Sequence, residues 1–156
     1  MNQWLSTKGE PVIALSGSLF SLSFFVSYLY GNYITAVANF VLAATSIAFH
    51  LYSTPVTFLM DQVALYTVVA RSFVDGYNGG LYGMTIPVVI NTYNYIVLFS
   101  PYSKYLEYHP NKTIGTFFHA TIHLFAVIGV IAEQYCISML TKDNEIIQDQ
   151  GDNHEY

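Results

Sequence analysis

The sequence predicts an all-α membrane protein, a polytopic bundle of about five transmembrane helices. Two observations support this fold class. Of the 156 residues, 53% are hydrophobic and only 10% are charged, whereas the surface of a soluble domain needs about a quarter or more of charged residues. Five apolar runs also follow one another, and each has the roughly 20 residues that a helix needs to cross a bilayer. This leaves no length for a separate soluble domain.

The first run, 11–30, begins with Pro11, a residue favoured in the first turn of a helix. It is of full span length and has no basic flank or small-residue cleavage site, so we interpret it as a retained anchor. The second run, 33–53, and the third, 55–75, are rich in Val, Ile, Thr and Tyr. In water these residues favour strands, but a segment isolated in lipid must satisfy its own backbone, so we expect helices.

The fourth run, 81–100, contains Gly83 and Pro87, which membrane helices tolerate and which can bend them. The fifth run is 114–138. Many of the 14 tyrosines lie near the ends of runs, as expected for aromatic belts at the membrane surface. A β-barrel would instead require shorter segments of alternating hydrophobicity.

The charged residues divide the chain into two parts. We expect residues 1–141 to form the transmembrane domain and residues 142–156 an acidic, disordered tail that carries most of the net charge of −5. Only five Lys and Arg are present, without a cluster, which excludes a nucleic-acid partner. The predicted location is therefore integral in a membrane, multi-pass, and an endomembrane if the host is eukaryotic.

Four ionisable residues within the runs are candidates for a functional site, because each costs roughly 2.5–3.5 kcal/mol to insert. His50 lies near the end of the second run, Asp61 near the start of the third, and His119 and His123 near the start of the fifth. Since successive spans alternate in direction, all four are expected at similar depth near one face. A polar network that holds the helices together is the alternative.

The spacing of these residues favours a metal site. Ser46 and His50 are four apart, as are His119 and His123, so each pair shares one helix face. Three imidazoles with an open fourth position are typical of catalytic zinc sites. We therefore predict a Zn²⁺ cofactor bound by the three histidines, with Asp61 and Ser46 as catalytic residues.

Two further possibilities remain at this point. Paired histidines also bind haem, but ligands four apart on one helix point to one ion and not to opposite faces of a haem. In the fourth run, Asn91 and Asn94 would either line a cavity or form hydrogen bonds between helices.

Ser-x-x-x-His, an Asp eleven residues after that His, and a late His-x-x-x-His together resemble the CREST superfamily of membrane hydrolases. This superfamily includes alkaline ceramidases, adiponectin-type receptors and lipases that remodel GPI anchors. The stretch SIAFHLYSTPVTFLMD is most similar to the GPI-remodelling branch, which has Thr-Pro-x-Thr between the His and the Asp, and EPVIALSGSLFSL resembles the start of that branch's first span. The resemblance implies that His50, His119 and His123 bind zinc, that Asp61 orients or deprotonates water, and that Ser46 assists at the water or the oxyanion.

The chain departs from the superfamily in its number of spans, because the superfamily has seven. If two spans are removed, the number of spans before the late histidine pair stays odd or even as before, so the pair still lies near the same face of the membrane. The two missing helices would normally form part of the wall of the lipid cavity. A homo-oligomer could complete it. Leu15 stands where alkaline ceramidases have an acidic calcium ligand, which disfavours a calcium-regulated ceramidase.

These features predict a zinc-dependent intramembrane lipid hydrolase that cleaves an acyl ester, in preference to a ceramide amide, of a membrane lipid by metal-activated water. The alternatives are a non-catalytic zinc-containing receptor or binding protein of the same superfamily, and an amidase of the alkaline-ceramidase type.

Overall fold

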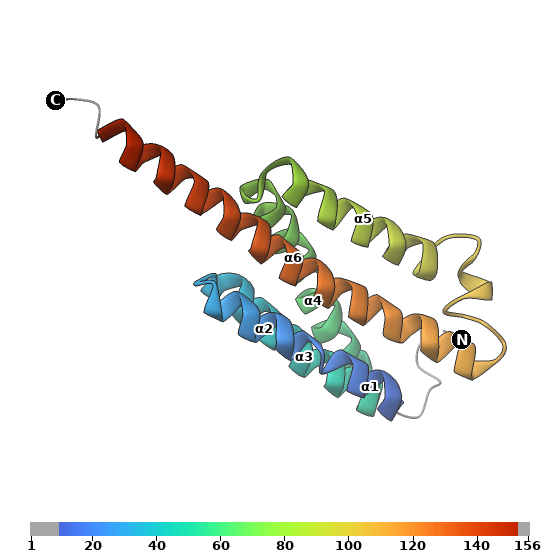
Figure 1. The fold of residues 1–156 in the computed structure, drawn as a ribbon. Coiled ribbons are helices and arrows are strands. Elements are labelled where there is room, and N and C mark those ends of the chain that lie inside the picture. Colours follow the sequence, from blue (N-terminus) through green and yellow to red (C-terminus); the bar gives the residue numbers. More distant parts are fainter. Residues whose placement is uncertain (1–9, 153–156) are drawn as a thin grey trace.

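The computed structural model describes residues 10–152, with side chains as far as Lys142, and every regular element in this part is helical. The elements are α1 (Pro11–Gly17), α2 (Phe20–Leu29), α3 (Tyr33–Tyr52), α4 (Pro55–Asn78), α5 (Gly80–Leu98), the 3₁₀ turn η2 (Ser103–Tyr105) and α6 (Lys112–Asp152). The predicted all-α class is thus confirmed. The first predicted run contains two short helices, α1 and α2, which follow one line (Figure 1).

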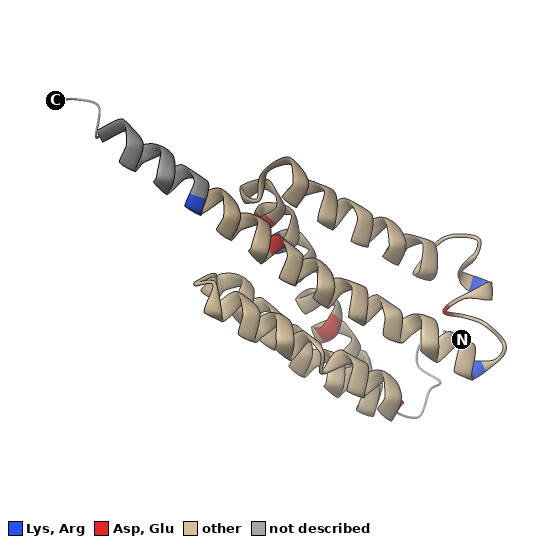
Figure 2. Cartoon of the chain, in the orientation of Figure 1, with Lys and Arg blue, Asp and Glu red and all other residues tan. Residues whose placement is uncertain are grey.

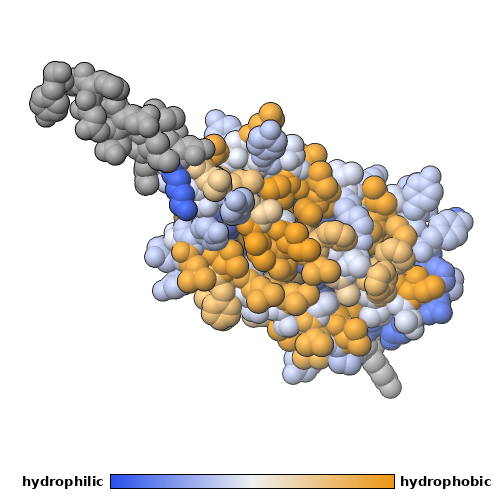
Figure 3. Space-filling view, in the orientation of Figure 1, coloured by the Kyte–Doolittle hydropathy of each residue, from blue (hydrophilic) through white to orange (hydrophobic). Residues whose placement is uncertain are grey.

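Within the described residues, three helical segments are long and apolar enough to cross a membrane, namely Pro11–Leu29, Tyr33–Tyr52 and Lys112–Lys142. They correspond to the first, second and fifth predicted runs. Figure 2 shows that charged residues are sparse along the helices, and Figure 3 shows hydrophobic residues covering the middle of the visible face. This distribution is the one expected of a surface that contacts lipid.

The turns between the first helices follow from their capping residues. Gly31 adopts a φ of 76°, a conformation that glycine reaches without strain, and the side chain of Asn32 then accepts a hydrogen bond from the Thr35 amide to begin α3. At the start of α4, Thr54 and Thr57 form a reciprocal capping box. These caps allow α2, α3 and α4 to pack as antiparallel neighbours.

Close packing between α4 and α5 explains why α4 extends beyond the predicted end at residue 75. Only Gly79 separates the two helices. A Cβ atom on Gly83 would lie 2.6 Å from the carbonyl oxygen of Gly76, so only a residue without a side chain fits here. The two helices are therefore held together at this end of the bundle.

The helix α6 is central, because it packs against α1, α2, α4 and α5 (Figure 1). The helix α3 lies between the first helical segment and α4. The buried core contains apolar side chains from α2, α3, α4 and α6: Phe20, Leu42, Ala43, Ala64, Val68 and Val127.

A polar network around Asp75 joins α3, α4 and α6 at one end of the bundle. The fully buried carboxylate of Asp75 pairs with Arg71 at 2.6 Å. Its other oxygen accepts hydrogen bonds from Thr35 at 2.6 Å, Asn32 at 3.1 Å and Gln134 at 3.3 Å. Because these partners come from different helices, the network fixes how the helices meet at this end.

The helix α6 continues past residue 142, where the predicted tail begins. The backbone of α6 is helical as far as Asp152. The side chains of residues 143–156 lie outside the described part of the chain, so the acidic, disordered tail stays a prediction.

Candidate metal centre

Three histidines from two helices meet at the end of the bundle opposite Asp75. His50 lies in the last turn of α3, and His119 and His123 lie on successive turns near the start of α6. One ring nitrogen from each lies within 4.8 Å of the others. The ring centroids are 4.8 Å apart for His50 and His119, 4.9 Å for His119 and His123, and 5.6 Å for His50 and His123. The prediction that these residues come together is confirmed.

The cluster has the size and chemistry that a single metal ion requires. Three atoms within 4.8 Å of one another lie no more than about 2.8 Å from a common point, and zinc binds imidazole nitrogen at about 2.0–2.1 Å. Small rotations of the rings would therefore bring all three nitrogens to one ion. His50 and His123 are buried and His119 is half-buried. The cluster could hold a metal ion, and its donor set fits zinc.

Hydrogen bonding to Ser16 orients the ring of His123. The Ser16 hydroxyl donates to the carbonyl oxygen of Ile13 at 2.8 Å and lies 2.9 Å from Nδ1 of His123. When the single proton of the hydroxyl goes to Ile13, the matching tautomer of His123 donates from Nδ1. Its Nε2 then carries the lone pair that a metal ion needs.

A carboxylate from the loop between α5 and α6 holds His119 in the same way. Oε1 of Glu107 lies 2.7 Å from Nδ1 of His119, a length typical of a charge-assisted hydrogen bond. Burial and the adjacent Glu107 carboxylate raise the pKa of Tyr108 to about 12, so this phenol stays neutral. Carboxylate–histidine pairs of this kind orient metal ligands and make them more basic.

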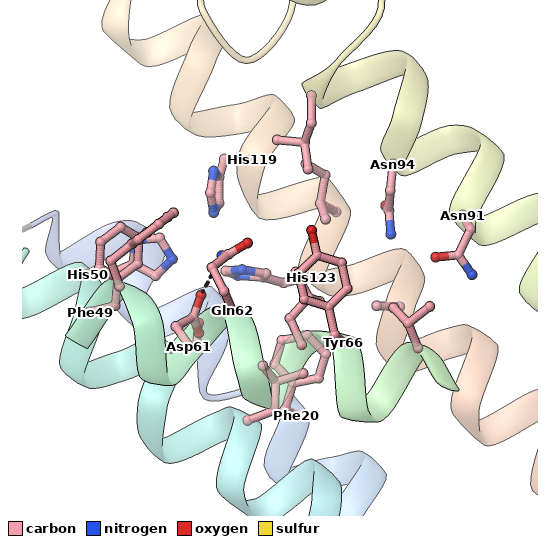
Figure 4. A pocket seen from close by; sticks show the side chains of 18 of the residues that line it. Phe20, Phe49, His50, Asp61, Gln62, Tyr66, Asn91, Asn94, His119 and His123 are labelled. Carbon is pink, nitrogen blue, oxygen red and sulfur yellow. Dashed lines mark hydrogen bonds between the residues drawn. The ribbon is translucent and has the colours of Figure 1, made fainter. Parts of the chain in front are cut away.

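The predicted catalytic residues line the same cavity as the histidines, which has a volume of about 460 Å³ (Figure 4). Asp61, near the start of α4, is buried. One carboxylate oxygen accepts a long hydrogen bond of 3.5 Å from Gln62, and the other has no partner within the described residues. Buried carboxylate oxygens are usually paired, so this oxygen is available to a ligand or to water.

Ser46 lies one turn before His50 on α3 and is also buried. The helix α1 approaches it closely, because a Cβ atom on Gly17 would lie 2.7 Å from the Ser46 hydroxyl oxygen. Gly17 therefore leaves the space that this hydroxyl occupies. Ser46 lies in the wall of the cavity, and its catalytic role stays a prediction.

Glu10 connects the elements that carry the cluster. Its backbone amide donates to the carbonyl oxygen of His50 at 2.7 Å. Its carboxylate pairs with Lys112 at 2.8 Å and accepts a hydrogen bond from Thr116 at 3.1 Å. The start of α1, the end of α3 and the start of α6 are thereby tied together at the metal-binding end.

Sequence reasoning missed the supporting residues Ser16 and Glu107. For Ser16 a signal existed, since the first run places it near the same face as the histidines. For Glu107 none existed, because a loop has no periodicity from which its path can be predicted. Of the two alternatives for Asn91 and Asn94, the structure shows the first, because both lie in the cavity wall.

No protein-family model matches the chain, and it has no match among curated proteins or solved structures. The chemistry of the site rests on its own residues. These place three imidazoles beside a carboxylate and a hydroxyl on the wall of one cavity. Such a set can hold a metal ion next to an acid–base group.

Proposed function

We propose that this chain is a zinc-dependent hydrolase of the membrane that cleaves an acyl ester of a bilayer lipid. The observation that carries the proposal is that a buried three-histidine cluster shares one cavity with Asp61 and Ser46. The motifs around these residues support membership of the CREST superfamily, nearest to its GPI-remodelling branch. The resemblance covers mainly residues 10–65 and 115–130, so it supports the site more strongly than the identity of the lipid.

We propose that α4 and α5 cross the membrane together with the three apolar segments. At 1.5 Å per residue, the 24 residues of α4 and the 19 of α5 reach about 36 and 28 Å, close to the thickness of the hydrocarbon core. The hydropathy of α4 is lowered by Asp61, Arg71 and Asp75, but both aspartates are buried within the bundle and the arginine is paired. Intramembrane charges normally face the interior in this way.

In the proposed reaction, His50, His119 and His123 would hold the metal through imidazole nitrogens. A zinc ion bound there would supply Lewis acidity for the carbonyl group and for the attacking water. Asp61 takes a proton from the attacking water through its unpaired oxygen and passes it to the leaving alcohol. Ser46 donates a hydrogen bond to the oxyanion that develops on the carbonyl oxygen.

The apolar remainder of the cavity supports a lipid as substrate. Phe49, Phe58, Leu65 and Leu98 line it beside the polar residues, which suits an acyl chain whose carbonyl lies near the histidines. A ceramide amide would use the same groups, with Asp61 returning the proton to an amine. The ester is favoured because the Thr54-Pro55 sequence resembles the lipase branch.

The test combines metal analysis with lipid hydrolysis by purified protein in detergent. Wild type is expected to contain about one zinc per chain and to release fatty acid from long-chain esters. His119→Ala/His123→Ala should lose both properties at equal folded yield, and Asp61→Asn should keep zinc but lose turnover at least 100-fold. Metal-free wild type prepared without chelator would refute the proposal.

The same experiment distinguishes the second candidate, a zinc-containing receptor or binding protein. The number of predicted spans favours that candidate, because five helices lack two of the seven that would surround a lipid cavity in the superfamily. Bound zinc without turnover of any ester or amide would support it over the enzyme. The related hypothesis that a homo-oligomer completes the cavity is contradicted if the active species in detergent has the mass of a monomer.

A further inference from the structure

The helix α5 forms the wall of the cavity opposite the histidines and contributes two polar side chains to it. Figure 4 shows Asn91 and Asn94 on this wall, across the cavity from His119 and His123. Tyr93 holds this part of α5 beside the histidine-bearing part of α6. Its hydroxyl lies 2.5 Å from that of Thr121, and its ring packs against Phe125. The two asparagines therefore lie at about the depth of the histidine cluster.

Both asparagine side chains have an acceptor oxygen without a partner among the described residues. The amide nitrogen of Asn91 donates to the carbonyl oxygen of Pro87 at 2.7 Å, which leaves its oxygen in the cavity wall. The side-chain oxygen of Asn94 is buried and makes no hydrogen bond. An unpaired acceptor in an apolar setting is costly, and a hydrogen-bond donor on a ligand would remove that cost.

The lining of the cavity reaches the outer surface of the bundle on α4 and at the end of α5. Its lining includes three aromatic side chains that are also largely exposed, Tyr66 at 65%, Tyr95 at 58% and Phe99 at 62%. At the other end of the same two helices, Gly76 and Gly83 are in close contact and leave no gap. An acyl lipid would thus enter between the histidine-side halves of α4 and α5, where an aromatic rim suits the membrane interface.

We propose that Asn91 and Asn94 form a subsite for a hydrogen-bond donor of the bound lipid. The favoured substrate then carries an O–H or N–H group close to its acyl carbonyl. A fully substituted diacyl ester lacks such a hydrogen-bond donor. Sites with polar groups that a ligand must satisfy reject analogues without the matching group. This inference rests on the proposed function, since it places the acyl carbonyl at the histidines.

The test measures binding, so that it does not depend on turnover. Zinc-loaded Asp61→Asn protein in detergent is titrated with two matched pairs of long-chain lipids. One pair is a monoacylglycerol and its di-O-methyl ether, and the other is an N-acylethanolamine O-methyl ether and the same lipid with its amide nitrogen methylated. In at least one pair, the donor-bearing lipid should bind about five- to tenfold more tightly, the value of one hydrogen bond. The pair that discriminates identifies the donor as hydroxyl or amide.

Substitutions of the two asparagines test whether they cause the difference in affinity. In Asn91→Leu and Asn94→Leu, each added to Asp61→Asn, the affinity ratio should fall toward one while the methylated lipid binds as before, which shows that the cavity is intact. Thr92→Val, on the exposed face of α5, should leave the ratio unchanged. Equal affinities within both pairs, or a ratio that both leucine variants preserve, would overturn the subsite.

Hydrolysis by protein with Asp61 intact separates this inference from the proposed function. If the protein binds the donor-bearing lipids more tightly but hydrolyses no lipid, the proposed subsite stands and the proposed hydrolase function is refuted. Hydrolysis of diacyl and monoacyl esters at equal rates, without discrimination in binding, would refute the subsite alone.

Discussion

Replacing Glu107 by glutamine should weaken zinc binding, although Glu107 is not itself a predicted ligand. Its carboxylate lies 2.7 Å from Nδ1 of His119, and both side chains are largely shielded, with 15% and 18% of their surface exposed. A hydrogen bond to a charged group contributes about 1.5–3 kcal/mol, against about 0.5–1.5 kcal/mol for a neutral pair. Glutamine retains an acceptor oxygen but loses the charge, so about 1–1.5 kcal/mol should be lost.

This loss corresponds to a zinc dissociation constant roughly five- to tenfold higher for Glu107→Gln, since each 1.4 kcal/mol is a factor of ten. Glu107→Ala removes the hydrogen bond as well and should approach a 100-fold increase, the upper end for residues that support metal ligands. The dissociation constants are measured by competition with a chromophoric zinc chelator, using purified protein in detergent.

A matched control separates orientation of His119 from loss of negative charge at this end of the bundle. Glu10→Gln also removes a carboxylate there, but Glu10 contacts Lys112 and Thr116 and no histidine ring. It should change zinc affinity less than twofold. Equal dissociation constants for wild type and Glu107→Gln, or equal losses for Glu107→Gln and Glu10→Gln, would refute the reasoning.

Three further substitutions test the packing that supports the site. Gly17→Ala introduces a methyl group 2.7 Å from the Ser46 hydroxyl oxygen, and should lower lipid turnover at least tenfold with zinc retained in elemental analysis. Asp75→Ala leaves the half-buried Arg71 and several buried donors without their carboxylate partner, and should reduce the free energy of unfolding by about 3 kcal/mol, measured as a lower unfolding temperature in detergent. Gly83→Ala places a methyl group 2.6 Å from the Gly76 carbonyl oxygen and should force α4 and α5 apart, at a cost of about 1–3 kcal/mol in the same assay. An unchanged unfolding temperature in either of the last two variants would contradict the packing described.

The candidate metal cluster was predictable because its determinants are periodic. Spacing of four residues puts His119 and His123 on one helix face, and alternating span direction brings His50 to the same end. Neither inference needs tertiary detail. The prediction that Asp61 and Ser46 act in catalysis is not tested by their positions, although both lie in the wall of the same cavity.

The α4–α5 connection was harder to predict because glycine has two opposite uses. The glycines between residues 75 and 80 suggest a flexible loop after the third run. In the structure, Gly76 belongs to α4 and allows close approach to Gly83, as small residues do where membrane helices pack. Asp75 is consequently a buried network residue and not part of a loop. Whether a glycine lies in a loop or in a close helix contact depends on which helix packs against it. Sequence periodicity does not identify that helix.

The apolar layer between the two polar ends determines from which side the proposed site is reached. Phe20, Leu42 and Val127 occupy the core between the histidine cluster and the network around Asp75. Proton transfer needs polar groups or water, and these side chains offer neither. In the proposed reaction, protons and the polar product therefore leave through the histidine end, beside Glu10 and the loop that carries Glu107, and the fatty acid leaves sideways into the lipid. This arrangement needs only the helices that carry the histidines, Asp61 and Ser46.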